Sequence, residues 1–528
     1  MTDTISSDDG AQWPLPDSPS YGGTLRRLGG ASRTTAMTAA VSLVLLGGVT
    51  TVAVRSFAPG SNLADAVPGS AFGVATFDLS LPDGQDDATA HLVKRFPGAP
   101  TGAGSIRDRL LNEFFKSTSD PHVDYSAVKP WLGDHVAVAG WLDESGAAKL
   151  EFLVQSTDDA AARKTVHGAA PDIGLAFSHG YAVLAETQAD ADAAVRAASK
   201  SSLAHNSTYS GDIGALDGTP AATGWLDAAG MVKAIKHELD TQHGDGFNFF
   251  TSGFGNPTGR VVAGLRVSDD GDNSAVELDV LNRGSKPSSR ATSTDRLLHL
   301  PDGTVAAAAL ADPGGVVRDA ATAISGPLAL FFGGFSAGMS CSVTMSDPSQ
   351  PPLSDCPPPS SSETDPLTEI SDLIGITVPD DLVSLLGSDA VVAYGGISGF
   401  GTPKIGVRSK PADVNAAADV VTKLRNRLAG TNVELAELPV GGDFVLATSE
   451  DYADDLAKSG SLGKNARFAD AMDGMPGSVQ FAAYVDLAAI LPLATHGMVP
   501  QLDHLTALGV WSANVGGDQK TSIRLIVH

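Results

Sequence analysis

The sequence predicts an α+β fold of two similar halves behind one N-terminal transmembrane helix. Three observations predict it. Six predicted elements recur in the same order in residues 60–290 and 296–528. Within each half, alternating apolar strands follow one another locally and are interspersed with Ala-rich helices, which is typical of antiparallel sheets covered by helices. One uncharged stretch, residues 36–54, precedes both halves.

The uncharged stretch reads AMTAAVSLVLLGGVTTVAV. At ~1.5 Å per residue, a helix of this length covers a hydrocarbon core of about 30 Å. Arg26, Arg27 and Arg33 precede it, and only Arg55 follows directly. The span and the positive-inside rule therefore predict a single-pass membrane protein with a cytoplasmic tail over residues 1–35 and an extracellular C-terminal domain. Ser, Asp, Pro and Gly dominate the tail, which is expected to be disordered. A cleaved signal peptide is the alternative, since Ser56-Phe57-Ala58 resembles a cleavage site.

Composition predicts a large acidic domain after the span. Hydrophobic residues make up 42% of the 528 residues and charged residues 18%, so a sizeable core is available. The formal net charge is −26, and all of it follows residue 55 because the charges up to and including Arg55 balance. Such a surface repels phosphate backbones, which argues against nucleic acid as a partner. The abundance of Ala, Gly, Val and Asp suggests a GC-rich genome such as that of an actinobacterium.

Only two cysteines occur, Cys341 and Cys356, and both follow the span. They bracket a Pro/Ser-rich stretch, and we assign residues 341–366 to one loop. Outside the cell a disulfide between them is expected, worth ~3 kcal/mol in the chain-entropy model. Two free thiols are the alternative.

The repeat is clearest at two places. A Leu-Gly corner feeds a strand in both halves, with Trp131, Gly133 and Asp134 in the first and Gly387 and Asp389 in the second. Later, HGYAVLAETQADADAAVRAASKSSLAHN matches GGDFVLATSEDYADDLAKSGSLGKN, a strand followed by a helix.

Helix starts are expected at Asp158 and Asp159 and at Pro411 and Asp413, which are residue types that such positions favour. Thr187 and Ser449 are expected to be N-caps. Trp131 is expected to be a core anchor. The two halves are expected to pack as a pseudo-symmetric pair, with a shared sheet as one arrangement.

A family resemblance rests on Lys94-Arg95-Phe96-Pro97-Gly98, on Val128–Asp134 (VKPWLGD) and on Ser201-Ser202-Leu203-Ala204. With these motifs, residues 60–528 resemble an actinobacterial membrane-anchored family catalogued as a domain of unknown function, number 3352. The second half lacks the Pro-Trp of the corner. The resemblance implies an N-terminal span and an exported domain, and it implies no catalytic residue.

Gly334-Phe335-Ser336-Ala337-Gly338 matches the G-x-S-x-G nucleophile elbow. The chain is rich in glycine, so about half a match is expected by chance, and a Pro-rich loop follows instead of a helix. The sequence favours a glycine-rich helix end packed on Phe331, Phe332 and Phe335 over a catalytic serine.

Metal-binding patterns are equally weak. His237 and His243 lie near Glu238 and Asp240, which favours a solvated helix face over a ligand set. Residues 269–273 (DDGDN) lack the spacing of a calcium loop and favour a hairpin turn. We therefore predict no metal and no cofactor.

Asp227 and Asp486 occupy equivalent places in the repeat, each after an aromatic-apolar pair. Two facing carboxylates could perform acid/base chemistry. A helix-capping role for each is the favoured interpretation.

Taken together, these features predict a non-enzymatic binding or interaction module at the cell envelope. Its partners would be the bilayer, through the span, and an envelope protein or a small ligand. The alternatives are a carrier of lipids or other apolar ligands, lined by small-residue strands such as VAAAALA, and a hydrolase.

Overall fold

The computed structural model describes residues 63–80, 85–96, 107–108, 111–112, 125–243, 259–284, 289–315, 371, 375–398, 401–430, 434–495 and 502–528. These residues form helices and antiparallel strands, which confirms the α+β class. The predicted tail at 1–35, the span at 36–54 and the loop at 341–366 lie outside them. None of the helices in the described ranges is long and apolar enough to cross a membrane.

The first half contributes eight strands: β1 (Ala71–Asp78), β2 (Leu132–Leu142), β3 (Ala148–Ser156), β4 (Gly174–Ser178), β5 (Tyr181–Ala185), β6 (Ala222–Asp227), β7 (Arg260–Asp269) and β8 (Ser274–Arg283). Its helices are α2 (Leu63–Ala66), α3 (Gln85–Arg95), α5 (Tyr125–Val128), α6 (Asp159–Ala169), α7 (Gln188–Lys200), η3 (Leu203–His205), α8 (Ser207–Ile213) and α9 (Ala228–His243).

The second half contributes β10 (Ala306–Ala311), β11 (Asp389–Ile397), β12 (Pro403–Ser409), β13 (Ala436–Val440), β14 (Asp443–Ala447), β16 (Phe481–Asp486), β17 (Leu505–Val515) and β18 (Asp518–Val527). Its helices are α11 (Asp295–Leu298), α15 (Asp380–Leu386), α16 (Val414–Leu428), α17 (Glu450–Ala457), η5 (Leu462–Lys464), α18 (Ala466–Ala471) and α19 (Leu487–Thr495). β9 (Thr292–Ser293) and β15 (Ser478–Val479) form a separate two-stranded sheet.

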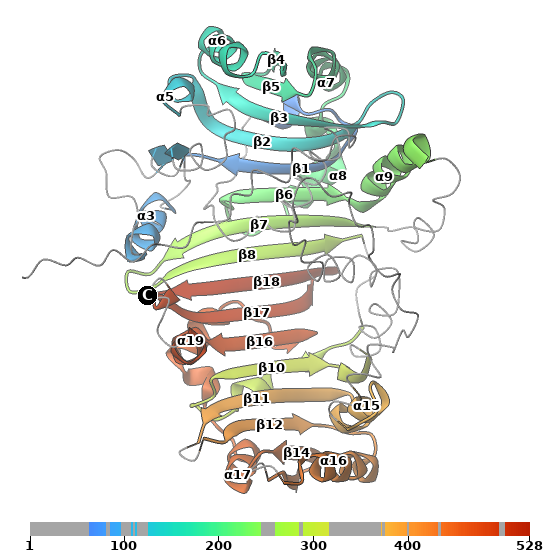
Figure 1. Ribbon diagram of the computed structural model, residues 1–528, viewed down its shortest axis with the longest axis vertical. Coiled ribbons are helices and arrows are strands. Elements are labelled where there is room, and N and C mark those ends of the chain that lie inside the picture. The colour runs from blue at the N-terminus through green and yellow to red at the C-terminus, as the bar shows by residue number, and fades with distance from the viewer. Residues whose placement is uncertain are drawn as a thin grey trace, which may run out of the picture. The chain divides into compact units, whose positions relative to one another are not determined.

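All the other strands belong to one sixteen-stranded sheet (Figure 1). The first half runs β4-β5-β3-β2-β1-β6-β7-β8, and the second runs β13-β14-β12-β11-β10-β16-β17-β18. Each half therefore uses the same order from its edge inward. The halves join where β8 pairs with β18, antiparallel, from Ser274↔Val527 to Asn282↔Gln519.

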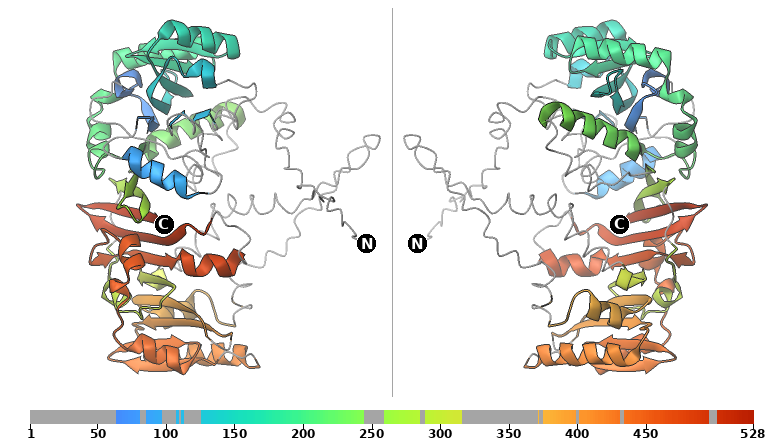
Figure 2. Two further views of the ribbon diagram at one scale, coloured as in Figure 1. Left: turned by 90° about the vertical axis from the view of Figure 1, so that its left-hand side faces the viewer. Right: turned by 90° about the vertical axis from the view of Figure 1, so that its right-hand side faces the viewer.

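The two faces of the sheet differ in what covers them. We call the face that carries Val262, Leu281 and Trp511 the core face; α7, α8, α17 and α18 pack on it. The opposite face is called the aliphatic face below. Figure 2 shows α3, α9 and α19 together on that side of the sheet. The aliphatic face is covered toward the edges by α5 and α6 in the first half and by α15 and α16 in the second.

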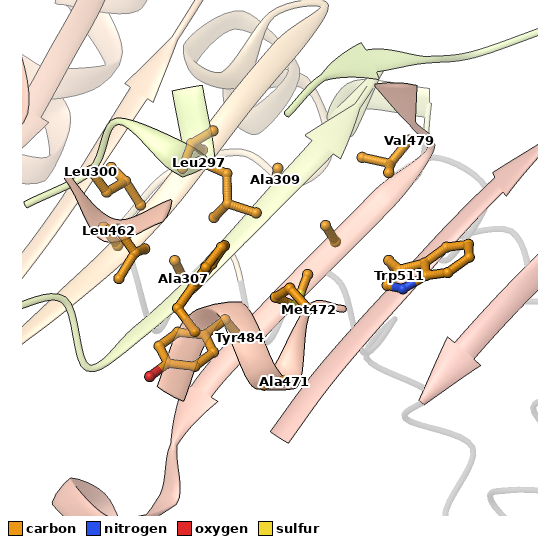
Figure 3. Close-up of a cluster of buried hydrophobic side chains, with 14 of the residues drawn as sticks. Leu297, Leu300, Ala307, Ala309, Leu462, Ala471, Met472, Val479, Tyr484 and Trp511 are labelled. Atoms are coloured by element: carbon orange, nitrogen blue, oxygen red, sulfur yellow. The ribbon is translucent and has the colours of Figure 1, made fainter. Parts of the chain in front are cut away.

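The core of each half is built on the same aromatic contact. In the second half, Phe468 of α18 meets Tyr484 of β16 with ring centroids 5.0 Å apart. In the first, Tyr209 of α8 meets Trp225 of β6 at 5.5 Å. Figure 3 shows Tyr484 among the small side chains of β10, Ala307 and Ala309. Small residues on the strands let the helices approach closely enough to bury these rings.

The helix starts follow the local sequence. Asp158 accepts hydrogen bonds from two backbone N–H groups of α6, and Asp413 does the same for α16. Thr187 caps α7 and Ser449 caps α17. Because each cap satisfies N–H groups that lack a partner within the helix, the predicted helix starts are confirmed, with Asp158 and Asp413 as the capping residues of their pairs.

Candidate functional site at the junction of the two halves

The strands β7, β8, β18 and β17 form the junction, where the two halves meet about a local pseudo-two-fold axis. Equivalent hairpins, β7–β8 and β17–β18, place Asp279 and Ser522 at matching positions. These two residues are also paired with each other across the junction. A position that pairs with its own counterpart lies on the symmetry axis, so the axis passes between Asp279 and Ser522.

On the core face, the axis carries a network of charges. Asp279 is 2% exposed, and its Oδ2 lies 2.8 Å from Arg266 and 3.1 Å from Lys520. Glu277 accepts from Arg266 at 2.9 Å and from Arg524 at 3.0 Å. Carboxylates this buried are stabilised only where cations neutralise them, so the network ties strands of both halves together.

Lys520 extends this network toward the surface. Its Nζ lies 2.8 Å from Asp217 and 5.5 Å from the centre of the Trp511 ring. The cation therefore has two carboxylates and one aromatic face as neighbours. These ion pairs link strands of both halves, which favours a structural role for the charges, although the buried Oδ1 of Asp279 has no hydrogen-bond partner among the described residues.

The aliphatic face of the same four strands is apolar and only partly buried. The described helix α3 packs on the hairpin end of β7 and β8, through Ala88 and Leu92, and α19 contacts β17. Val276 and Leu525 also pack against the α3 contact. Outside that contact, a continuous row of half-buried side chains follows the strands: Val261, Ala263, Leu265, Leu278, Val280, Leu508, Val510 and Ile523. A sheet normally buries its apolar face and hydrates its charged one. The junction places its charges inward on the core face instead.

A patch of neutral polar side chains borders this row where β17 and β18 turn. Gln519 Nε2 donates to Gln480 at 2.7 Å and to Ser512 at 3.2 Å. Gln480 Nε2 in turn donates to Asn514 at 2.7 Å. Amides and hydroxyls of this kind can donate and accept without a net charge, so the border suits ligands with their own amide or hydroxyl groups.

A small pocket of about 130 Å³ lies between the halves at the β7–β8 turn. Asp270 and Asn273 line it from one half, and Asp470 and Arg524 from the other. Burial and then the charge of Asp270 raise the pKa of Asp470. The turn itself is closed by Asp270 Oδ1 accepting from the Asn273 N–H at 2.7 Å, so the hairpin prediction for residues 269–273 is confirmed.

The two repeat-equivalent carboxylates do not face each other. Asp227 ends β6 and Asp486 ends β16, and five strand spacings of about 4.8 Å, roughly 24 Å in all, separate those strands. Asp227 Oδ1 accepts from the Ala229 N–H at 3.1 Å, and Asp486 Oδ1 from the Ala489 N–H at 3.0 Å. Each carboxylate thus binds the first turn of the helix that follows it.

The corner residues lie at strand starts. Trp131 is 3% exposed, and its indole N–H donates to the Ala127 carbonyl at 3.1 Å. A Cβ on Gly133 would lie 2.7 Å from the Gln155 side chain, so this corner has no room for one. Asp134 pairs with Arg107.

The second corner differs in register. Gly387 has a φ of 63°, which favours glycine. Asp389 lies opposite Ala311, as His135 lies opposite Asp78, so Asp389 matches His135 and not Asp134. Asp389 accepts from Thr292 at 2.5 Å and binds Arg296.

Other candidates fall outside the described residues. These are Cys341, Cys356 and Ser336, together with the side chains of Glu238, Asp240 and His243. Within the described ranges, no three His, Cys, Asp or Glu side chains are arranged to hold a metal ion.

Glu151, a carboxyl on β3 with 0% exposure, is a buried acidic residue that the sequence does not predict. Among the described residues neither of its oxygens has a hydrogen-bond partner, and burial raises its pKa well above the usual range. Its strand reads AKLEFLVQS. Charged residues alternate with apolar ones in this stretch, which is also the pattern of charged residues that face solvent. No local signal distinguishes it from an exposed glutamate.

Comparison with known proteins adds little. No family model matches the chain, so its resemblance to the family of unknown function stays a prediction. No curated protein matches either. A solved structure, crystal form III of TP0453, covers 43% of this chain and 82% of its own, with 8% identity and a TM-score of 0.20. A likeness this low carries no argument about fold or function.

Proposed function

We propose that this protein is a membrane-anchored, extracytoplasmic binding module without enzymatic activity, which holds a partner at the cell envelope through the aliphatic face of the junction. The uncharged stretch at residues 36–54, with arginines before it, supports the anchor and the outward orientation. We place the chain in the cell membrane as a single-pass protein on the same grounds.

The single observation that carries the binding role is the row of half-buried aliphatic side chains on β7, β8, β18 and β17. Contiguous apolar surface of this kind marks interaction sites in proteins. The row crosses the junction, so it forms only when the two halves are assembled. The polar border at Gln480 and Gln519 would give such a surface orientation and specificity.

A carrier of lipids or other apolar ligands is the second candidate, and the same row favours it. Acyl chains and apolar protein surfaces make the same contacts with Leu278 or Ile523, so the occupant has to be identified by experiment. A hydrolase based on Asp227 and Asp486 is not favoured, because paired catalytic carboxylates act within about 10 Å of each other.

Photo-crosslinking in the native membrane tests this proposal. A photoreactive amino acid at Leu278, in the full-length chain, reports what lies on the junction. The matched control carries it at Lys458, whose side chain is 69% exposed on the surface beyond α17. We expect adducts from position 278 that are absent from position 458.

The chemistry of the adduct decides between the candidates. A protein adduct supports the interaction module, and a lipid adduct supports the carrier. If position 278 crosslinks only to peptides of the same chain, this face is internal to the protein and the proposed function is wrong.

A further inference from the structure

The two edge strands of the sixteen-stranded sheet are equivalent in the repeat, but they differ in how their unpaired main-chain groups are blocked from binding another strand. β4 forms one edge and β13 the other. Each leads through a two-residue turn into its partner, with Ser178↔Tyr181 and Val440↔Asp443 as closing pairs. In such hairpins alternate residues of the edge strand direct their N–H and C=O groups away from the partner. An unpaired strand edge binds other strands unless something blocks it.

The β4 edge is blocked by a side chain. The Leu175 N–H donates to Gln188 Oε1 at 3.0 Å, and Gln188 Nε2 donates to the Leu175 carbonyl at 3.0 Å. The amide of Gln188 thus takes both positions that a further strand would use. Gln188 is the first residue of α7, held in place behind the Thr187 cap.

Among the described residues, no side chain blocks the β13 edge in this way. Glu450, the first residue of α17 behind the Ser449 cap, stands where Gln188 stands, and Glu437 stands where Leu175 does. A carboxylate cannot donate to the Glu437 carbonyl, and it repels the Glu437 side chain. From the register, the outward groups of β13 include the N–H and C=O of Glu437 and the C=O of Pro439. The next carbonyl, that of Leu435, already accepts from Arg425 at 3.1 Å.

A groove of about 640 Å³ follows this edge between α16 and α17. Leu438 and Ala453 provide apolar lining. The charged residues of the lining are one cation, Arg425, and four acids: Glu434, Glu437, Glu450 and Asp454. The groove therefore attracts positive charge beside main-chain groups that can pair with a strand.

We propose that the β13 edge binds an extended, basic segment of a protein partner as an added strand. The segment pairs its main chain with Glu437 and Pro439, and its Lys or Arg side chains lie in the acidic groove. Pro439 has no N–H to offer, which limits the pairing to a short stretch and keeps the edge from templating a continuous sheet. This edge is separate from the junction, so the inference stands independently of the proposed function.

Glu450→Gln is the decisive variant, because it installs at β13 the side chain that blocks β4. The probe is a fluorescent peptide, Lys-Thr-Val-Lys-Val-Thr, added to the full-length chain in detergent micelles. Glu144→Gln is the matched control: it removes the same charge from a side chain that is 95% exposed elsewhere. We expect Glu450→Gln to weaken binding by about tenfold or more, and Glu144→Gln to leave it unchanged.

A second pair of variants separates strand pairing from charge. Glu437→Pro removes the outward N–H together with the carboxylate, whereas Glu437→Gln removes only the charge. Strand pairing predicts a larger loss of affinity for the proline variant. It also predicts that N-methylation of the first valine of the peptide abolishes binding. If wild-type protein does not bind the peptide, if Glu450→Gln binds as wild type, or if the two Glu437 variants lose affinity equally, the inference is wrong.

Discussion

Glu151 and Gly406 occupy the same position in the two halves, on β3 opposite Ala185 and on β12 opposite Ala447. The helix above compensates for the difference in size. Leu456 of α17 packs over Gly406, and its counterpart on α7 is Ala194, which is fully buried. In the first half the strand residue is large and the helix residue small, and in the second half the reverse holds. The space between strand and helix is filled in both, as close packing of the interior requires.

Replacing Glu151 tests the cost of its buried carboxyl. An unfolded Glu ionises near pH 4.3, whereas the buried one, with its raised pKa, keeps its proton to higher pH. Above about pH 4.3 the native state therefore binds more protons than the unfolded state, and the free energy of unfolding falls as pH rises, until the pH passes the raised pKa.

We expect Glu151→Met to unfold at higher denaturant concentration than wild type. The difference should widen by about 1.4 kcal/mol per pH unit within that window. Urea titrations at several pH values measure it, with Glu144→Gln as the exposed control. A difference that does not depend on pH would mean that Glu151 is ionised in the fold.

Gly406→Ala tests the residue of the second half that occupies the position of Glu151. Its Cβ would collide with Leu456 Cδ1, so we expect a loss of about 1–3 kcal/mol in the free energy of unfolding. Gly168→Ala, in α6 with open space around it, should be neutral or slightly stabilising. Thermal unfolding of Leu456→Ala with and without Gly406→Ala completes a double-mutant cycle. Additive losses would contradict direct contact between the two residues.

At the scale of elements, local signals decide where helices begin. Ser449 accepts from the Tyr452 N–H at 3.3 Å, and it also positions Glu450 beside the β13 edge. We expect Ser449→Ala to lower the free energy of unfolding by about 1 kcal/mol, as loss of a cap does elsewhere. Circular dichroism during thermal unfolding measures this. Ser449→Asp should retain stability, and equal losses in both variants would rule out a capping role.

The sequence predicted the elements better than their assembly. The α+β class, the N-caps and the turn at residues 269–273 depend on neighbouring residues, so they could be predicted. The β8–β18 pairing could not, because both strands alternate in the same way and either could equally be an edge. Likewise, the row on the aliphatic face exists only once that pairing sets the register, and Glu151 is buried where β3 contacts α7, a helix that begins at residue 188.

At the scale of the whole domain, the junction depends on charges that both halves supply. Asp279→Leu would leave Arg266 and Lys520 without their shared, buried partner, and we expect a loss of about 3 kcal/mol in the free energy of unfolding. Asp217→Asn removes the exposed partner of the same lysine, with a side chain 71% exposed, and should change it by less than about 1 kcal/mol. Chemical denaturation of both variants compares them, and similar effects would show that the network contributes little.

The central position of β18 in the sheet affects when the sheet can be completed during synthesis. This strand, Asp518–Val527, is synthesised after every other strand of the sheet, yet it lies between β17 and β8. The first half must therefore wait with the edge of β8 unpaired while the whole second half is made. During that interval β8 is exposed to the wrong neighbours, including the same strand of another nascent chain. Folding of this protein is thus most vulnerable just before its last strand arrives.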